Sequence, residues 1–568
     1  ISLCFMSHSS KIFEAQPIRV QNLNGFDLSH MNSGTAYCGT LTPVLTYLAM
    51  QETRFSLGCA VQVELPPLAT AAFGRVDVHI ECFWTRCSIL YGGWKQFISN
   101  NPETSFISGS GIVEHYDLPV FHPSNFDVAT GSLVSALDAS NYGLLDYVGF
   151  PVNSAIIARS LVNVNRDILL MPLINYHKIW DCFYRNPQVT RTIFAVNPDT
   201  NGPGFTHSVA FIHHSYVYAG SSGSPSGSSN QFNSASDTTF PDGISVFSLR
   251  QRNWANDYFT AGSLKPFQNG LTPQVEFTVD LNTGDGAVTL SAMRMVNSLG
   301  KFYEANNYDP TYEGIGRANY GHKPDDAGMD QPVYLGRLVV PVYQKGVYIS
   351  TSADSANFSV GSNPFINNDL GSEPGAKAAS ASFNGSGEIC KNFHCGAWGY
   401  ITGIFSLVPH AQYSFGVERH MLRTQIGDYA FPALQSVGMD SVKDYEVYAT
   451  GTNVVADTDF SYIGRYSSYK YINDRVVGEL RPGRTLASFI IQRDFGSAPS
   501  FNTSFMEIPI SALDHLFNTT SSTMKFSCWY EVYWVFKAVM PLAEFCVPTL
   551  GELQDSHTIR VKQGGSKL

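Results

Sequence analysis

The stretch KFSCWYEVYWVF, residues 525–536, carries the strongest structural pattern in the chain. Its side chains alternate with a period of two, which is the repeat of a β-strand. Tyr530 and Trp534 fall on one face of the extended chain, while Trp529 and Tyr533 fall on the other. Because both faces carry large residues, we expect a strand that is covered on both sides.

The same two-residue period recurs along the chain, as in RVDVHIEC at residues 75–82. Strands are predicted at residues 58–65, 76–83, 337–343, 399–408, 444–449, 486–492 and 525–536, with Val76, Val78, Ile80, Phe526, Tyr530 and Trp534 among the strand positions. Stretches rich in turn residues separate them, and these are longer than a compact meander needs. Low charge (15%) and many aromatic residues (13%) also favour a β-protein that buries surface against other subunits.

Helical spacing of apolar residues is confined to a few short segments. The clearest is residues 172–184, where Pro172 suits a first helical turn and Ile174, His177 and Trp180 follow at helical spacing. Residues 132–147 and 288–303 are further helix candidates.

These patterns predict a mainly β fold, a single eight-stranded antiparallel jelly roll with long loop insertions and a few short helices. We expect the jelly roll to span residues 1–568. Three segments depart from it: a Ser/Gly-rich surface insertion at 196–245, a long loop at 350–390 and a C-terminal tail at 548–568. Within the first, residues 219–236 are nearly pure Gly, Ser and Asn, so we expect them on the outer surface or at a symmetry axis.

Charge and cysteine content restrict the classes of function. The net charge of −11 argues against a protein that wraps nucleic acid over much of its surface. The ten cysteines have no repeated spacing, which favours reduced thiols and assembly in a cytoplasm. We find no secretory signal and expect no membrane insertion, because the apolar stretch at 528–547 alternates and contains charged residues.

No motif predicts catalysis or a metal site. Cys390, His394 and Cys395 are close in sequence but lack a fourth zinc ligand. The loop at 280–286 lacks the acidic and glycine positions of a calcium loop. Nucleophile-elbow, phosphate-loop, zinc-protease and dinucleotide patterns are also missing. We therefore predict no enzyme activity, no catalytic residue, no metal and no cofactor.

Two groups of basic residues are candidates for contact with nucleic acid. The first choice is the C-terminal tail, whose cations have few acids between them, and the second is a Tyr-rich segment where rings next to cations suit stacking on a single strand. The candidate residues are Arg560, Lys562 and Lys567 in the tail and Arg465, Lys470 and Arg475 in the Tyr-rich segment. Contact between subunits is the alternative for both groups.

Several segments, read in order, resemble the major capsid proteins of the Microviridae, and their gokushovirus branch in particular. The most specific is NDYFT at 256–260, followed by Pro266, Gln268 and Gly270. The others are FDLSH (26–30), RVDVH (75–79), GSL (131–133), LDYVGFP (145–151), YHKIWDCFYRNPQV (176–189), NYG (319–321), Asp325, QPVYLG (331–336) and the stretches 398–409, 428–438 and 460–480. The resemblance covers roughly residues 26–540 and rests on the shared order of these motifs.

The resemblance implies a structural major capsid protein that self-assembles into a T=1 icosahedral shell around a circular single-stranded DNA genome. It implies a virion protein assembled in the host cytoplasm. The implied partners are other copies of itself, packaged DNA, a small basic DNA-binding protein, a pilot protein, transient scaffolding and a host surface receptor reached by outer loops. Gokushoviruses carry a large insertion after the Pro-Gln element, but only residues 271–290 stand there in this chain, so a three-fold protrusion is not predicted.

The alternative is a carbohydrate-binding or carbohydrate-cleaving jelly-roll protein, because lectins share this fold and a fold does not determine function. A lectin would form small oligomers, whereas a capsid protein would form very large particles. Sedimentation of the purified protein separates the two classes.

Overall fold

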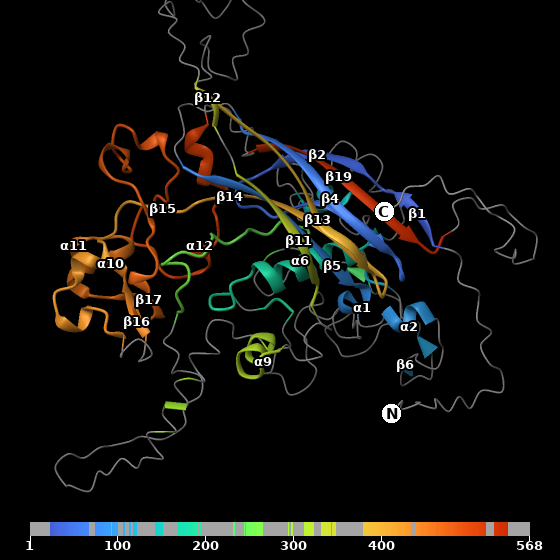
Figure 1. Cartoon of the computed structure of the whole chain (residues 1–568), viewed down its shortest axis with the longest axis horizontal. Coiled ribbons are helices and arrows are strands. Elements are labelled where there is room, and N and C mark those ends of the chain that lie inside the picture. Colours follow the sequence, from blue (N-terminus) through green and yellow to red (C-terminus); the bar gives the residue numbers. More distant parts are fainter. Residues whose placement is uncertain are drawn as a thin grey trace, which may run out of the picture.

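The computed structural model shows a mainly β protein with antiparallel sheets and short helices (Figure 1). It describes residues 23–66, 74–91, 94–99, 106–107, 113–114, 118–121, 143–150, 168–190, 192–194, 231–232, 244, 246–264, 294, 297–298, 301, 312–322, 331–341, 344–347, 379–432, 439–517 and 528–542. Most of the predicted insertion at 196–245 and the whole predicted tail lie outside these residues. Of the predicted loop at 350–390, the part from Ala379 onward is strand.

Two large antiparallel sheets form the body of the molecule. The first runs β1 (Asn24–Asp27), β19 (Cys528–Met540), β4 (Arg54–Glu64), β13 (Ala379–His394) and β12 (Gln344–Val347), and β2 (His30–Ala36) also pairs with β19. The second runs β11 (Val333–Pro341), β5 (Val76–Arg86), β14 (Gly399–Pro409) and β3 (Thr42–Ala49). The strand predictions at 58–65, 76–83, 337–343, 399–408 and 525–536 are confirmed, as far as their residues are described, by β4, β5, β11, β14 and β19. Residues 342–343 and 525–527, and with them the predicted strand position Phe526, lie outside the described residues.

The two sheets pack face to face, and the core lies between them. Trp534 of β19 is fully buried, and its indole nitrogen donates a hydrogen bond to the carbonyl of Val44 at 3.0 Å. A Cβ at Gly403 of β14 would lie 2.9 Å from the Trp534 ring, so the glycine makes room for that ring. Phe405 stacks on Tyr530 across the same interface, with ring centroids 4.8 Å apart. Burial of each such side chain contributes about 1.5–3 kcal/mol to stability.

The outer face of β19 does not match the sequence prediction. Its inward residues are buried, but Trp529, Tyr533 and Val535 are 40–46% exposed. The prediction that this strand is covered on both sides is therefore wrong for the single chain. The strands that are covered on both sides are β14 and β5, because a helix packs on the outside of the second sheet.

That helix is the one predicted at residues 172–184. It begins as α6 (Met171–Ile179), with Pro172 in its first turn, and continues as a π-helical turn, η6 (Trp180–Tyr184). Asn175 donates to the Thr402 hydroxyl of β14 at 2.8 Å, and Tyr184 donates to Glu81 of β5 at 2.6 Å. These polar contacts and the apolar cluster around them fix the helix against the sheet.

The other predicted helices are only partly within the described residues. Residues 132–142 lie outside them, and the helix at this place is α4 (Leu144–Val148), which ends at Gly149 with a φ of 108°. In the candidate helix at 288–303, the described residues Arg294, Asn297, Ser298 and Lys301 are helical.

Two strand predictions are wrong. Residues 444–449 form α10 (Asp444–Val447), because the Glu446 carboxylate accepts a hydrogen bond from the backbone N–H of Lys443 at 2.9 Å and so caps a helical turn. Residues 486–492 contain a 3₁₀ turn, η15 (Ala487–Phe489), which closes by a bond from Phe489 N–H to the carbonyl of Leu486.

The remaining elements are short. Outside the two sheets they are α1 (Cys87–Leu90), α2 (Trp94–Ser99), β6 (Phe106–Ile107), β7 (Val113–Glu114), β8 (Val120–Phe121), β9 (Ile168–Leu169), β10 (Gln231–Phe232) and α9 (Tyr312–Tyr320). Between β14 and β19 lie β15 (Gln412–Tyr413), η10 (Arg419–Leu422), η11 (Ile426–Asp428), β16 (Met439–Lys443), α10, α11 (Gly451–Ala456), β17 (Asp459–Gly464), η13 (Ser467–Tyr469), β18 (Asp474–Arg475), η14 (Gly478–Leu480), η15, α12 (Thr503–Met506) and η16 (Ile510–Leu516). Within the described ranges, every helix is too short or too polar to cross a membrane.

Candidate assembly surface and its anchor

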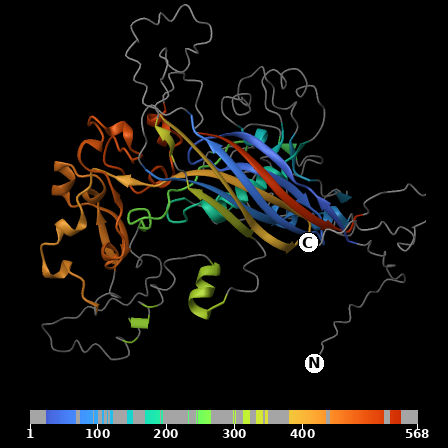
Figure 2. The ribbon, with the colours of Figure 1, turned by 45° about the horizontal axis from the view of Figure 1, so that its top comes forward.

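The described residues of 411–506 form a lobe beside the two sheets, drawn in orange to red at one end of the long strands (Figures 1 and 2). The lobe has an apolar cluster of its own. That cluster comprises Tyr258, Phe259, Tyr413, Val442, Val447, Phe460, Ile463, Phe501, Phe505 and Met506. Tyr258 and Phe259 come from the NDYFT segment, so this motif belongs to the attachment of the lobe.

Asp257 of the motif organises a tight turn and ties it to the lobe. One carboxylate oxygen accepts the backbone N–H groups of Phe259 and Thr260, at 2.9 and 2.8 Å. The other oxygen accepts the hydroxyl of Tyr413 in β15 at 2.6 Å. A single acidic side chain therefore holds both the turn and the first strand of the lobe.

Arg493 completes this anchor from the far end of the lobe. It is 6% exposed, and its guanidinium lies 4.1 Å from the ring centroid of Phe505 and 4.8 Å from that of Trp254. It donates to the Tyr413 hydroxyl at 3.0 Å and also to the Phe505 carbonyl. Trp254 belongs to the core between the sheets, so Arg493 joins that core to the lobe.

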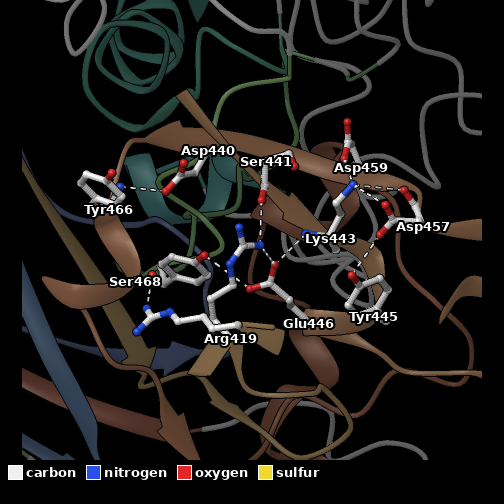
Figure 3. Close-up of polar contacts among 12 residues, drawn as sticks. Arg419, Asp440, Ser441, Lys443, Tyr445, Glu446, Asp457, Asp459, Tyr466 and Ser468 are labelled. Carbon is white, nitrogen blue, oxygen red and sulfur yellow. Dashed lines mark hydrogen bonds and ion pairs between the residues drawn. The ribbon is translucent and has the colours of Figure 1, made fainter. Parts of the chain in front are cut away.

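A second buried polar group lies inside the lobe (Figure 3). Arg419 donates to the Glu446 carboxylate at 2.6 Å and to the carbonyl of Ser441 at 3.0 Å. Tyr258 donates to the other carboxylate oxygen at 3.4 Å. Burial raises the pKa of Glu446 above its usual value even though Arg419 lies beside it. The pair therefore fixes the segment that starts at Arg419 to α10. Removal of Arg419 would leave the buried Glu446 carboxylate without its cation and would lower the stability of the fold.

At the rim of the lobe, Lys443 bridges two carboxylates (Figure 3). Its amine lies 3.1 Å from Asp457 and 2.8 Å from Asp459, and Tyr445 donates to Asp457 at 3.0 Å. Hydrogen bonds from Lys443 and Tyr445 lower the pKa of Asp457. Because these charged groups contact water, their ion pairs contribute little to the free energy of folding. Their main effect is to orient the edge formed by β16 and β17.

The three lobe residues predicted to face DNA lie on one segment of the chain, but they differ in exposure and in the groups they contact. Arg465 is half-buried, with its guanidinium 5.2 Å from the ring centroid of Tyr466. Lys470 is exposed. Arg475 is exposed and lies 3.4 Å from Glu418. The predicted tail residues Arg560, Lys562 and Lys567 lie outside the described residues.

Around this segment the lobe carries seven exposed large apolar side chains. We call the following group the apolar patch: Met421, Ile426, Tyr429, Phe431, Tyr469, Tyr471 and Ile472. Its two stretches are in contact, because the backbone N–H of Ala430 donates to the Tyr469 hydroxyl at 3.2 Å. Arg423 covers the Tyr469 ring at 3.6 Å and donates to Ser468 at 2.9 Å.

The cysteine and histidine group considered in the sequence is dispersed. His394 pairs with Glu52 at 3.0 Å, while Cys395 is fully buried. Burial raises the pKa of Cys390 to about 11 and that of Cys395 to about 12, which keeps both thiols protonated. Among the residues that the structure describes, no three of His, Cys, Asp and Glu gather as metal ligands would.

Sequence reasoning did not find the anchor residues Arg493, Glu446 and Arg419. Their partners are far away in sequence, for example 188 residues between Tyr258 and Glu446 and 80 between Tyr413 and Arg493. A usable signal was Arg493 in the stretch FIIQRDF of residues 489–495, where Asp494 is its one charged neighbour and the rest is mostly apolar. A charge among apolar neighbours is commonly buried and paired.

Comparison with known proteins gives matches that span nearly the whole chain. The family model described as "Capsid protein (F protein)" matches residues 18–549. The chain is 20% identical, over an alignment of 620 residues, to "Capsid protein VP1" of Chlamydia phage 1, covering 95% of this chain and 97% of that protein. It is 20% identical over 528 residues to "Capsid protein VP1" of Bdellovibrio phage phiMH2K, covering 88% and 90%.

Proposed function

This chain belongs to the capsid protein (F protein) family, and from that premise we propose that it is a major capsid protein which assembles into a T=1 icosahedral shell around circular single-stranded DNA. The observation that carries the proposal is the family match over residues 18–549, which includes both sheets and the lobe. The resemblance to Microviridae capsid proteins is confirmed, and it favours a structural protein of the virion over the carbohydrate-binding or carbohydrate-cleaving alternative.

The strand order supports an eight-stranded jelly roll. One sheet holds β2, β19, β4 and β13, and the other holds β3, β14, β5 and β11. The first sheet also holds the four-residue strands β1 and β12; among the other eight strands, taken along the chain, each step changes sheet except that from β5 to β11. Such alternation between two antiparallel sheets is how two interlocked Greek keys are wound, and this fold recurs in viral shells.

The partners are those that the resemblance to Microviridae capsid proteins implies. One is a small basic DNA-binding protein that neutralises the genome, which agrees with the net charge of −11 on this chain. A pilot protein, transient scaffolding and a host receptor reached by outer loops complete the set. Assembly takes place in the host cytoplasm, which agrees with free thiols at the eight cysteines described, from Cys38 to Cys528. The shell protein itself has no enzymatic role.

Contact with the genome is assigned first to the tail cations Arg560, Lys562 and Lys567, and second to Arg465, Lys470 and Arg475. Exposure of Lys470 supports the second group, whereas the pairing of Arg475 with Glu418 weakens it. Replacement of the three tail cations by Gln should give normal shells with reduced DNA content. Normal DNA content in those shells would show that the tail makes no important genome contact.

Expression of the full chain together with its phage's other structural genes tests the shell itself. Sedimentation and electron microscopy should show uniform icosahedral particles that contain circular single-stranded DNA. Particles of a different symmetry would refute the T=1 proposal, and small oligomers alone would refute the capsid role.

A further inference from the structure

The apolar patch departs from what a monomeric surface normally shows. Ile472 is 92% exposed, Ile426 is 81% exposed and Met421 is 71% exposed. Soluble monomers rarely leave large apolar side chains grouped on one surface, because water penalises the contiguous area. By contrast, the inward-facing apolar side chains of the two sheets, such as Trp534, are fully buried, and those on the outer face of β19 are no more than 46% exposed.

The patch is held in shape within the single chain. The Asp428 carboxylate accepts the N–H groups of Thr424 and Gln425, at 3.0 and 2.9 Å, and so fixes the turn that presents Ile426. On the other stretch, the backbone N–H of Tyr471 bonds to the Ser467 carbonyl at 3.0 Å. A surface fixed before contact loses less conformational entropy on binding.

The chemistry of the patch favours a protein partner over nucleic acid. Met, Tyr, Phe and Arg are the residues enriched in the centres of protein interfaces. The most exposed members, Ile472, Ile426 and Met421, have no ring that could stack on a base. Among the nearby cations, Arg423 lies over Tyr469 and Arg475 pairs with Glu418.

The charge around the patch indicates a second copy of this chain as the partner. Residues 465–484 carry five cations (Arg465, Lys470, Arg475, Arg481 and Arg484) against two acids, a net charge of +3. Since the whole chain carries −11, the rest of it carries −14. A basic, apolar surface on an otherwise acidic protein is complementary in charge to the remaining surface of a neighbouring copy.

We propose that the apolar patch is a subunit contact, by which the lobe of one copy docks on an acidic surface of its neighbour. This inference rests on the proposed capsid function and says which part of the chain carries the contact. It places Arg465, Lys470 and Arg475 at a subunit interface in preference to the second-choice genome contact. A contact between a patch and a different surface is heterologous, which is the kind that closes rings around symmetry axes.

The test places a charge at the two most exposed positions. Ile472→Asp and Ile426→Asp should each leave the melting temperature of the unassembled chain unchanged and reduce the yield of particles about tenfold or more. The protein should accumulate as monomers or small oligomers in sedimentation. Ile472→Leu keeps the apolar surface and should assemble normally. Val454→Asp, at a residue 49% exposed on α11 of the same lobe, is the matched control and should also assemble.

The outcomes separate the inference from the function on which it rests. If the unchanged chain forms no particles, the capsid proposal fails. If the unchanged chain assembles and both Asp variants reach its yield, the subunit-contact inference is overturned. Asp variants that form shells without DNA would make the patch a genome contact instead. Loss of folding in both variants would mean that the patch packs within its own chain, which also overturns the inference.

Discussion

The core between the two sheets and the surface of the lobe differ in the exposure of their large apolar side chains. Between the sheets, Trp534, Phe405 and Phe536 are fully buried, whereas on the lobe Ile472 and Ile426 are more than 80% exposed. The core between the sheets is therefore completed within one chain, although the outer face of β19 keeps Trp529, Tyr533 and Val535 partly exposed. The lobe leaves apolar surface that only another molecule can cover, which is expected of a protein whose final state is an assembly.

The interiors of the two regions also differ. The core between the sheets is large and almost entirely apolar, while the lobe interior contains the buried cation Arg493 and the buried carboxylate of Glu446, which pairs with the half-buried Arg419. A small cluster buries too little apolar area to define one arrangement by packing alone. Charged hydrogen bonds, which require a specific geometry, then fix the orientation of the lobe. The loss of one partner of such a bond leaves a buried charge unpaired and strongly lowers the stability of the fold.

The largest expected effect comes from the core between the sheets. Trp534→Ala should lower the free energy of unfolding by about 3–5 kcal/mol, because it removes a buried indole and leaves a cavity against Gly403. Denaturant unfolding of the unassembled chain measures this loss. Tyr533→Ala, one residue away on the exposed face of β19, is the control and should change stability by about 0.5 kcal/mol or less. Equal losses of unfolding free energy for Trp534→Ala and Tyr533→Ala would contradict the assignment of one face of β19 to the core and the other to the surface.

The second prediction concerns the anchor. Arg493→Met should cost about 2–3 kcal/mol, because the Tyr413 hydroxyl and the Phe505 carbonyl lose a charged donor. Amide hydrogen exchange should become faster throughout the lobe and stay slow in β5, β14 and β19. Arg481→Met, at an exposed position of the same lobe, should leave exchange unchanged. Faster exchange across both regions would show that the lobe and the sheets unfold as one unit.

Sequence patterns predicted the secondary structure correctly where the pattern within one segment is long enough to determine its conformation. The period of two in residues 525–536 and 76–83 is sustained over enough residues to predict β19 and β5. The helix at 172–184 was predicted from Pro172 and apolar spacing in the same way. Six residues at 444–449 were too few, because a single bond from the Lys443 N–H to Glu446 outweighed the alternation of Tyr445 and Val447.

The candidate surface was predicted less completely, because it depends on contacts between distant segments. The Tyr/Arg group at 465–475 was identified from composition, and its three cations do share one segment of the lobe. The role of NDYFT in anchoring the lobe could not be read from the motif, since Asp257 acts through Tyr413 and Tyr258 through Glu446. The exposure of Ile426 and Ile472 could not be predicted from the sequence either, because a single apolar residue gives the same sequence signal in a core and on a contact surface.

The third prediction uses pH to separate the regions. Burial alone would raise the pKa of Glu81 in β5, but the Arg252 guanidinium and the Tyr184 hydroxyl outweigh it and leave that pKa below its usual value. A carboxylate with a lowered pKa stabilises the fold above its unfolded value of 4.5 and loses that contribution as the pH falls through the folded value. Glu81→Gln should therefore reduce the fall in stability on acidification below pH 4.5.

The measurement is the free energy of unfolding of the unassembled chain at several pH values between 7 and about 3, for the wild type and for Glu81→Gln. The two curves should be offset above pH 4.5 and converge below it. Glu446 provides the contrast in the lobe, because burial raises its pKa, so its ionisation opposes folding as the pH rises above 4.5. Parallel curves for Glu81→Gln and the wild type would show that Glu81 does not contribute to acid unfolding.

The smallest expected effect is at the apolar patch itself, and it is the most informative for the comparison. Ile472→Ala should change the free energy of unfolding of the unassembled chain by less than about 0.5 kcal/mol, because the side chain contacts mainly water. The same substitution at Ile463, which is 6% exposed in the lobe interior, should cost about 2–5 kcal/mol. Denaturant unfolding of both variants in one buffer makes the difference independent of the solvent. A loss above about 1 kcal/mol at Ile472 would mean that its side chain already packs inside the chain. The exposed surface of the lobe would then need no partner, and its contrast with the buried core between the sheets would disappear.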